Sequence, residues 1–310
     1  ITDRLTGLMW EQKPLNKPVT WYEAFKRANE LNKKKFGGYS DWRVPNINEL
    51  YSLSSAKNPF KFDVVKSLNA IGIKFQRKVR FNPRLKNDYV KDTIVFWSSN
   101  SVIRKIRSEF DAYCIGDYGL SSSLKNVKSE GFYYLKYRTY YVICVRSKKK
   151  GYVEILKTGQ KKSYHKGDDG DLQHGAFIPK PRFVDNGNGT ITDRLTGLMW
   201  EQNPSKKKYT WEQSFKQIEE LNKKKLGGYS DWRLPNFAEL RSLAYIETFM
   251  SDYLKSNGFN IKNSIYWSST SESKKSAFCM GLSYGIIFLG DKKNGDTFKI
   301  IAVRGANPPK

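Results

Sequence analysis

The densest group of side chains suited to binding chemistry lies in residues 73–91, IKFQRKVRFNPRLKNDYVK. Cations pair with sulfate, carboxylate or phosphate, and aromatic rings stack on sugars or bases. The segment therefore predicts a site for anionic polymers, although a solvated insertion loop or a subunit contact remains the alternative. The candidate cations are Lys74, Arg77, Lys78, Arg80, Arg84, Lys86 and Lys91, and the candidate rings are Phe75, Phe81 and Tyr89.

A second basic and aromatic stretch occupies residues 132–140, FYYLKYRTY. If this stretch is a strand, alternate side chains lie on one face. That face would combine rings and cations as a ligand platform or as an assembly interface. Its members are Tyr134, Lys136, Arg138 and Tyr140.

Residue types that support catalysis are sparse and scattered. The two histidines, His165 and His174, lie between the repeated parts of the chain, and no Gly-rich phosphate loop or Cys/His metal spacing is present. We therefore expect a protein that is not an enzyme and that needs no cofactor.

Three cysteines and one acidic cluster complete the candidates. Three cysteines do not form a disulfide framework; a Cys114–Cys144 bridge is compatible with the sequence, whereas Cys279 has no partner and is expected in the core. The cluster Asp168, Asp169, Gly170 and Asp171 offers the hard oxygen ligands that calcium prefers, but a solvated turn is the favoured interpretation.

The charge of the chain favours anionic partners. The formal net charge is +25, and residues 1–150 hold 30 Lys and Arg against 13 Asp and Glu. Such an excess favours nucleic acid, acidic glycans or an anionic cell surface, and a lysine-rich surface selected for solubility is the alternative. Nucleic acid ranks lower because no nucleic-acid-binding motif accompanies the charge. We expect no membrane span, since the longest apolar runs are far too short.

The elements that must position these residues are repeated. Residues 1–50 align with residues 191–240 without a gap, and 35 of the 50 positions are identical. This length indicates a duplicated domain rather than a short solenoid unit. All eight tryptophans fall into matched pairs, which is typical of large core anchors. The pairs are Trp10 and Trp200, Trp21 and Trp211, Trp42 and Trp232, and Trp97 and Trp267.

Each copy predicts helices first and strands afterwards. Capping boxes at Thr20 and Thr210 begin a helix that a glycine, Gly37 or Gly227, ends. Further caps at Asn46 and Asn236 begin a short second helix through residue 50 or 240. Strand-like segments follow, and a hairpin precedes the second copy at residues 183–193. The fold class is therefore α+β, with two helices packed on a small antiparallel sheet in each copy.

The predicted boundaries are a first domain at residues 1–146, a lead-in at 147–182, a second domain at 183–306 and a tail at 307–310. Asp41 and Arg43 flank Trp42 in both copies, which favours a structural ion pair or backbone clamp over chemistry. Residues 1–3 lack the hairpin partner that residues 183–185 give to residues 191–193. We therefore expect a neighbouring subunit or upstream chain to cover them.

Several strings together carry a family resemblance: DNGNGTITDRLTGLMWEQ, TWEQSFKQIEELN, LGGYSDWRLPNFAELRSL, YWSST and AVRG. The sequence resembles the Lcl (Legionella collagen-like) C-terminal domain family in two tandem copies. This resemblance implies a C-type-lectin-like fold, more distantly related to formylglycine-generating enzymes. It also implies an extracellular or surface binding module, because the domain of the member that gives the family its name binds sulfated glycosaminoglycans.

The expected function is thus that of a lectin-like adhesion protein, extracellular or at the cell surface, which recognises acidic glycans or other polyanions. The alternative is a structural subunit of an extracellular filament or surface assembly, in which the basic and tyrosine-rich surfaces are contacts between subunits.

Overall fold

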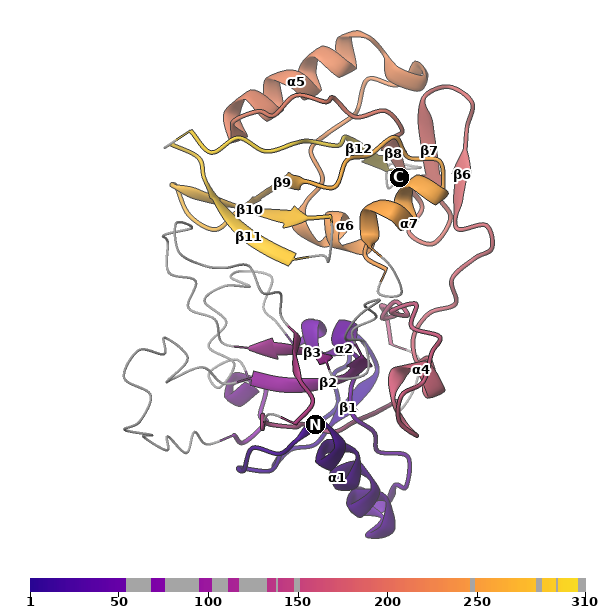
Figure 1. Cartoon of the computed structure of the whole chain (residues 1–310), viewed down its shortest axis with the longest axis vertical. Coiled ribbons are helices and arrows are strands. Elements are labelled where there is room, and N and C mark those ends of the chain that lie inside the picture. Colours follow the sequence, from indigo (N-terminus) through magenta and orange to yellow (C-terminus); the bar gives the residue numbers. More distant parts are fainter. Residues whose placement is uncertain are drawn as a thin grey trace. The chain divides into compact units, whose positions relative to one another are not determined.

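The computed structural model describes residues 1–53, 68–75, 95–101, 111–116, 133–137, 139–147, 151–245, 249–282, 286–293 and 295–305. The chain forms two compact units, Ile1–Ala176 and Phe177–Lys310 (Figure 1). Residues 151–176, which the sequence places in the lead-in, thus belong to the first unit.

The first unit combines short helices with two antiparallel sheets. One sheet has the order β2–β3–β4, with β2 at Val95–Ser101, β3 at Asp111–Gly116 and β4 at Tyr133–Leu135. The other pairs β1, Leu8–Trp10, with β5, Val145–Ser147. The helices are α1 at Trp21–Lys33, the single 3₁₀ turn η1 at Phe36–Gly38, α2 at Ile47–Ser52 and α4 at Asp169–Leu172.

The second unit repeats this combination of helices and two antiparallel sheets. Its four-stranded sheet is β12–β8–β7–β6, formed by Val303–Gly305, Leu198–Glu201, Thr190–Asp193 and Phe183–Asp185. Its three-stranded sheet is β11–β10–β9, formed by Ile286–Asp291, Ser276–Gly281 and Ile265–Ser271. The helical elements are α5 at Trp211–Lys223, η2 at Leu226–Gly228, α6 at Phe237–Ser242 and α7 at Met250–Ser256.

The mixture of helix and antiparallel sheet confirms the α+β class, but the described parts differ from the expected single sheet and two helices. Each unit has two sheets and a further helical segment after the second helix, at residues 68–70 in the first unit and as α7 in the second. The strand pairing explains the first difference. The strands that open and close each copy, β1 and β5 or β8 and β12, pair with each other and leave the middle strands to form a separate sheet.

The helices begin where the capping residues predict. Complete capping boxes start α1 at Thr20, α2 at Asn46, α5 at Thr210 and α6 at Asn236. The long helices end earlier than the glycines suggest. Lys35 and Lys225 already adopt left-handed backbone angles, with φ of 46° and 50°, before Gly37 and Gly227 continue the turn. Short polar caps therefore fix the helix starts, whereas the ends are set one turn before the glycines.

The tryptophans join the helices to the sheets, as expected of core anchors. The indole N–H of Trp21 donates to the Ser98 carbonyl at 2.9 Å, and that of Trp97 donates to the Val19 carbonyl at 2.9 Å. The second unit repeats both bonds through its matching tryptophans. Seven of the eight tryptophans are buried, and Trp211 alone is half-buried. The scaffold interpretation of these rings is therefore confirmed.

The charged residues beside Trp42 are structural, as predicted, and their partners are now defined. Asp41 pairs with Arg146 on β5, whose guanidinium lies 3.7 Å from the centre of the Tyr39 ring. Arg43 forms two 2.6 Å bonds with Glu49 of α2. The second unit repeats both ion pairs. These forked pairs connect the loop before α2 to the closing strand and to the helix.

The hairpin expected before the second copy is present as β6 and β7, with Phe183 opposite Asp193. At the start of the first unit, Thr2 forms a bridge to Met9, and the Trp10 N–H donates to the Ile1 carbonyl at 2.7 Å. Residues 1–3 thus pair with β1 as residues 191–193 pair with β8.

Candidate functional site

Most of the predicted polyanion contacts lie outside the residues that the structure describes. Tyr134 lies on β4 opposite Ala112, and only its backbone is described. For the residues that the structure does not describe, binding of a polyanion stays a prediction. Those outside the described residues are Arg77, Lys78, Arg80, Phe81, Arg84, Lys86, Tyr89, Lys91 and Arg138.

Lys74 and Phe75 are part of the shared scaffold. Lys74 is exposed and its backbone N–H donates to the Gln12 carbonyl, as that of Asn260 donates to Gln202 in the second unit. Phe75 is 2% exposed and packs edge-on against Phe96 and Tyr141. The expectation that Phe75 stacks on a ligand is therefore wrong, because its ring fills the core.

Lys136 also lies inside the fold. β4 ends at Leu135, so the strand alternation that predicts a shared face does not continue through Lys136 and Tyr140. The Lys136 ammonium lies 4.1 Å from the centre of the Trp21 ring and 4.9 Å from that of Tyr164, and the residue is 2% exposed. Tyr140 is half-buried and edge-on to Trp97. This corrects the predicted surface platform: both side chains pack inward.

Two of the cysteines are buried free thiols. Cys144 is free, so the Cys114–Cys144 bridge that the sequence allowed is not formed. Cys279 is also free and fully buried, which confirms its expected place in the core. Burial raises the pKa of both thiols, and the Glu11 carboxylate raises that of Cys144 further. Both thiols are therefore protonated packing groups at neutral pH.

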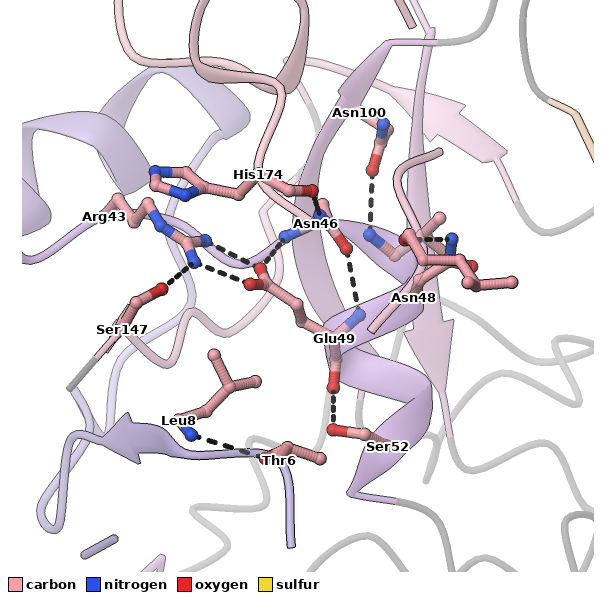
Figure 2. A network of polar contacts seen from close by, with 12 residues as sticks. Thr6, Leu8, Arg43, Asn46, Asn48, Glu49, Ser52, Asn100, Ser147 and His174 are labelled. Carbon is pink, nitrogen blue, oxygen red and sulfur yellow. Dashed lines mark hydrogen bonds and ion pairs between the residues drawn. The ribbon is translucent and has the colours of Figure 1, made fainter. Parts of the chain in front are cut away.

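Residues 155–175, which we call the docked segment, lie across the N-terminus of α2 in the first unit. Asn46 donates its side-chain amide to the His174 carbonyl at 3.0 Å, and Asn48 donates to the Leu156 carbonyl at 2.9 Å (Figure 2). The Arg43–Glu49 pair lies beside these amides and is almost fully buried. Asparagines on and next to α2 thus hold both ends of the segment by its backbone.

The middle of the docked segment is held by Asn100 on β2. Its side-chain oxygen accepts from the Ile47 backbone N–H, and its amide nitrogen lies 2.9 Å from the Asp169 carboxylate. The same nitrogen lies 3.0 Å from the Thr158 hydroxyl. All of these groups are buried, and burial raises the Asp169 pKa to about 6.

The acidic cluster is built into this segment. Asp168 caps α4 by accepting from the Asp171 N–H at 3.0 Å, and both Asp168 and Asp169 are buried. A Cβ at Gly170 would lie 2.2 Å from the Lys162 carbonyl oxygen, so the segment folds closely on itself there. Neither a solvated turn nor a calcium loop describes this arrangement. Within the described ranges, no group of three or more His, Cys, Asp or Glu side chains could hold a metal ion.

Rings of the docked segment cover the start of α1. His165 stacks on Phe25 with ring centres 4.4 Å apart and meets Trp21 edge-on at 5.9 Å. Trp21 is fully buried beneath this cover. Both histidines of the chain therefore contribute to docking, His165 through its ring and His174 through its carbonyl.

A cluster of lysines in the second unit is the candidate binding surface that the sequence analysis missed. Lys206, Lys207, Lys208 and Lys262 are exposed, and the Lys299 ammonium donates to the Lys206 carbonyl at 2.6 Å. Burial, followed by the nearby charges of Lys208 and Lys262, lowers the Lys299 pKa. The run of three lysines before Tyr209 is the signal that could have identified it, since residues 16–18 of the first copy, NKP, lack it. The cluster concentrates positive charge where a polyanion could neutralise it.

Within the part of the chain that the structure describes, no helix has the length and apolar character needed to cross a membrane. A search of curated proteins finds no match for this chain. A family model, described as the Lcl C-terminal domain, matches residues 1–146 and 189–304. Apart from β6 and the last residue of β5 and of β12, these two ranges contain both sheets of each unit, together with the tryptophan, cap and arginine positions that hold them together. The chain therefore belongs to the Lcl C-terminal domain family.

Proposed function

We propose that this protein is a non-catalytic binding protein, extracellular or at the cell surface, that recognises acidic glycans or other polyanions. Membership of a family associated with surface and secreted proteins supports the location. The lysine cluster around Lys299 is the observation that carries the ligand class: Lys299 is bonded to the Lys206 carbonyl, Lys206–Lys208 and Lys262 are exposed, and the pKa of Lys299 is lowered first by burial and then by the charges of Lys208 and Lys262. A sulfated or carboxylated polymer would relieve that repulsion and release counterions.

The cluster suits a polymer better than a single small anion. Its lysines come from three separated segments, at residues 206–208, 262 and 299, and the four outer lysines are exposed. Lysine ammonium groups act as mobile point charges and do not impose the planar geometry of an arginine fork. Such a surface favours a flexible chain with repeated negative charges. The basic insertion of the first copy would extend binding to the same class of ligand.

Heparin chromatography in a rising salt gradient tests this proposal. Replacing Lys206, Lys207 and Lys208 by Gln should move elution to clearly lower salt, because each lost phosphate- or sulfate-like contact removes about one counterion from the salt dependence. The matched control replaces Lys223, Lys224 and Lys225, which are an equally long exposed run at the end of α5. Equal shifts in both variants, or elution of the unaltered protein with neutral proteins, would contradict a localised polyanion site.

A third variant tests the insertion separately. Replacing Arg77, Lys78 and Arg80 by Gln should also weaken heparin retention if the first copy contributes contacts. Retention that depends on the insertion alone would support polyanion binding but remove the lysine cluster from the site.

A further inference from the structure

The surface that the docked segment covers in the first unit has a matching surface in the second unit that the described residues leave open. Arg43 and Arg233 form the same forked pair with a glutamate, but their side chains are 7% and 46% exposed. Asn46 is buried, whereas its counterpart Asn236 is exposed. The local sequences are nearly identical, DWRVPNINEL and DWRLPNFAEL, so the difference arises from the docked segment.

The aromatic part of this surface is also open in the second unit. Trp211 and Phe215 meet edge-on with ring centres 4.6 Å apart, as Trp21 and Phe25 do at 4.7 Å. The Lys292 ammonium lies 3.9 Å from the Trp211 ring centre, where the first unit places Lys136 over Trp21. Trp21 and Phe25 are buried under His165, whereas Trp211 and Phe215 are only half-buried. The second unit therefore keeps the ring platform without the imidazole that covers it.

We propose that the exposed surface around Trp211, Arg233 and Asn236 binds an extended peptide segment of a partner polypeptide, with the chemical character of residues 155–175. That character is an aromatic–histidine pair followed by a one-turn acidic helix, Tyr164–His165 and then α4. The first unit shows this type of segment seated on the same scaffold (Figure 2). Residues 155–175 themselves are held by the first unit through buried groups, so a partner polypeptide is the occupant that we assign to the second.

The second unit keeps the platform but has lost two polar contacts, so binding should be reversible. Ala238 stands in place of Asn48, and Thr270 stands in place of Asn100. Thr270 still accepts from the Phe237 N–H at 2.9 Å, which replaces the bond from Ile47 to Asn100. It offers no amide to a threonine or aspartate of the ligand. These replacements suit a surface that binds a partner and releases it, in contrast to the covered surface of the first unit.

The experiment uses a fluorescent synthetic peptide of residues 155–176 as the probe and the whole chain as the receptor. Fluorescence anisotropy should show saturable binding that a scrambled peptide does not reproduce. Trp211→Ala should weaken binding by about tenfold or more, since a central aromatic contact dominates such interfaces. Ala238→Asn with Thr270→Asn should strengthen binding by about tenfold, because it restores the two amides of the first unit. A gain of affinity cannot result from misfolding.

Three outcomes would overturn the proposal. Binding that Trp211→Ala leaves unchanged would show that the peptide exchanges into the first unit. Binding by the double variant alone would show that the natural surface does not take this segment. If the chain forms dimers without added peptide and the Trp211→Ala variant is monomeric, a second copy, and not a different polypeptide, occupies the surface. The lysine variants in the heparin experiment leave Trp211 intact, so failure of one proposal does not imply failure of the other.

Discussion

At the scale of single residues, the two units differ in the partner of a buried glutamate. Glu11 is fully buried and forms an ion pair with Arg27, and it accepts from the Cys144 backbone N–H at 3.2 Å. Glu201 occupies the matching position and accepts from the Ala302 N–H at 3.1 Å, but Gln217 stands in place of the arginine. Burial raises the Glu201 pKa to about 7. The second unit thus carries a carboxyl group that is easier to bury when protonated.

This residue should make the second unit less stable as the pH rises. The folded unit retains the Glu201 proton to about pH 7, whereas the unfolded chain loses it near 4.5. The contribution of protonated Glu201 to the free energy of unfolding is therefore fully present below pH 4.5 and is lost as the pH rises through 7, a change of about 3 kcal/mol in all. Hydrogen exchange of the β8 amides at a series of pH values measures it. Glu201→Gln should remove this slope and Gln217→Arg should reduce it, while Glu212→Gln on the exposed face of α5 should not. An unchanged slope in Glu201→Gln would assign the effect to another group.

At the scale of elements, the capping asparagine has two tasks at α2 in the first unit and one at the matching helix, α6, in the second. Asn46 caps α2 by accepting from the Glu49 N–H at 2.9 Å, and its amide also holds the His174 carbonyl. Asn236 caps α6 with the same geometry, but its amide is exposed. The same residue therefore begins a helix in both units and additionally holds the docked segment in one.

Replacing these asparagines separates the two tasks. Asn236→Ala should cost about 1 kcal/mol, the usual price of an N-cap. Asn46→Ala should cost about 2–4 kcal/mol, because it also removes the amide that donates to the half-buried His174 carbonyl. Urea unfolding of each variant gives the free energies. Hydrogen exchange should show faster opening of residues 168–174 in Asn46→Ala only. Equal costs for the two variants would mean that the amide contributes little to docking.

At the scale of the whole molecule, the chain consists of two units that share a scaffold and differ in what covers it. The first unit extends beyond the repeat to Ala176 because the docked segment completes it. In the second unit, the last strand of the described residues is β12, which pairs with β8. The docked segment is therefore one source of difference between the units, in addition to the lysine cluster of the second copy.

Fragments of the first unit test this view. A fragment of residues 1–176 should unfold cooperatively at a clearly higher temperature than one of residues 1–150, which exposes Trp21 and Arg43. Circular dichroism gives both midpoints, and tryptophan emission should shift to longer wavelength in the shorter fragment. Added peptide of residues 155–176 should restore the emission of the shorter fragment. Identical midpoints would show that the segment lies on the unit without stabilising it.

The sequence by itself determines the local features of this protein and the repeat. Four capping boxes, the paired tryptophans and the α+β order can be read directly, because caps and periodicity act within a few residues. The tertiary structure decides what is buried. Phe75 and Lys136 have surface-like neighbours in sequence, yet both lie inside through contacts to distant residues. Arg43 and Arg233 lie in nearly the same local sequence, but only Arg43 is covered. The docked segment covers it, and Asn100 holds that segment through Asp169, which lies 69 positions away in the chain. Burial depends on such distant contacts, which no local pattern of residues encodes.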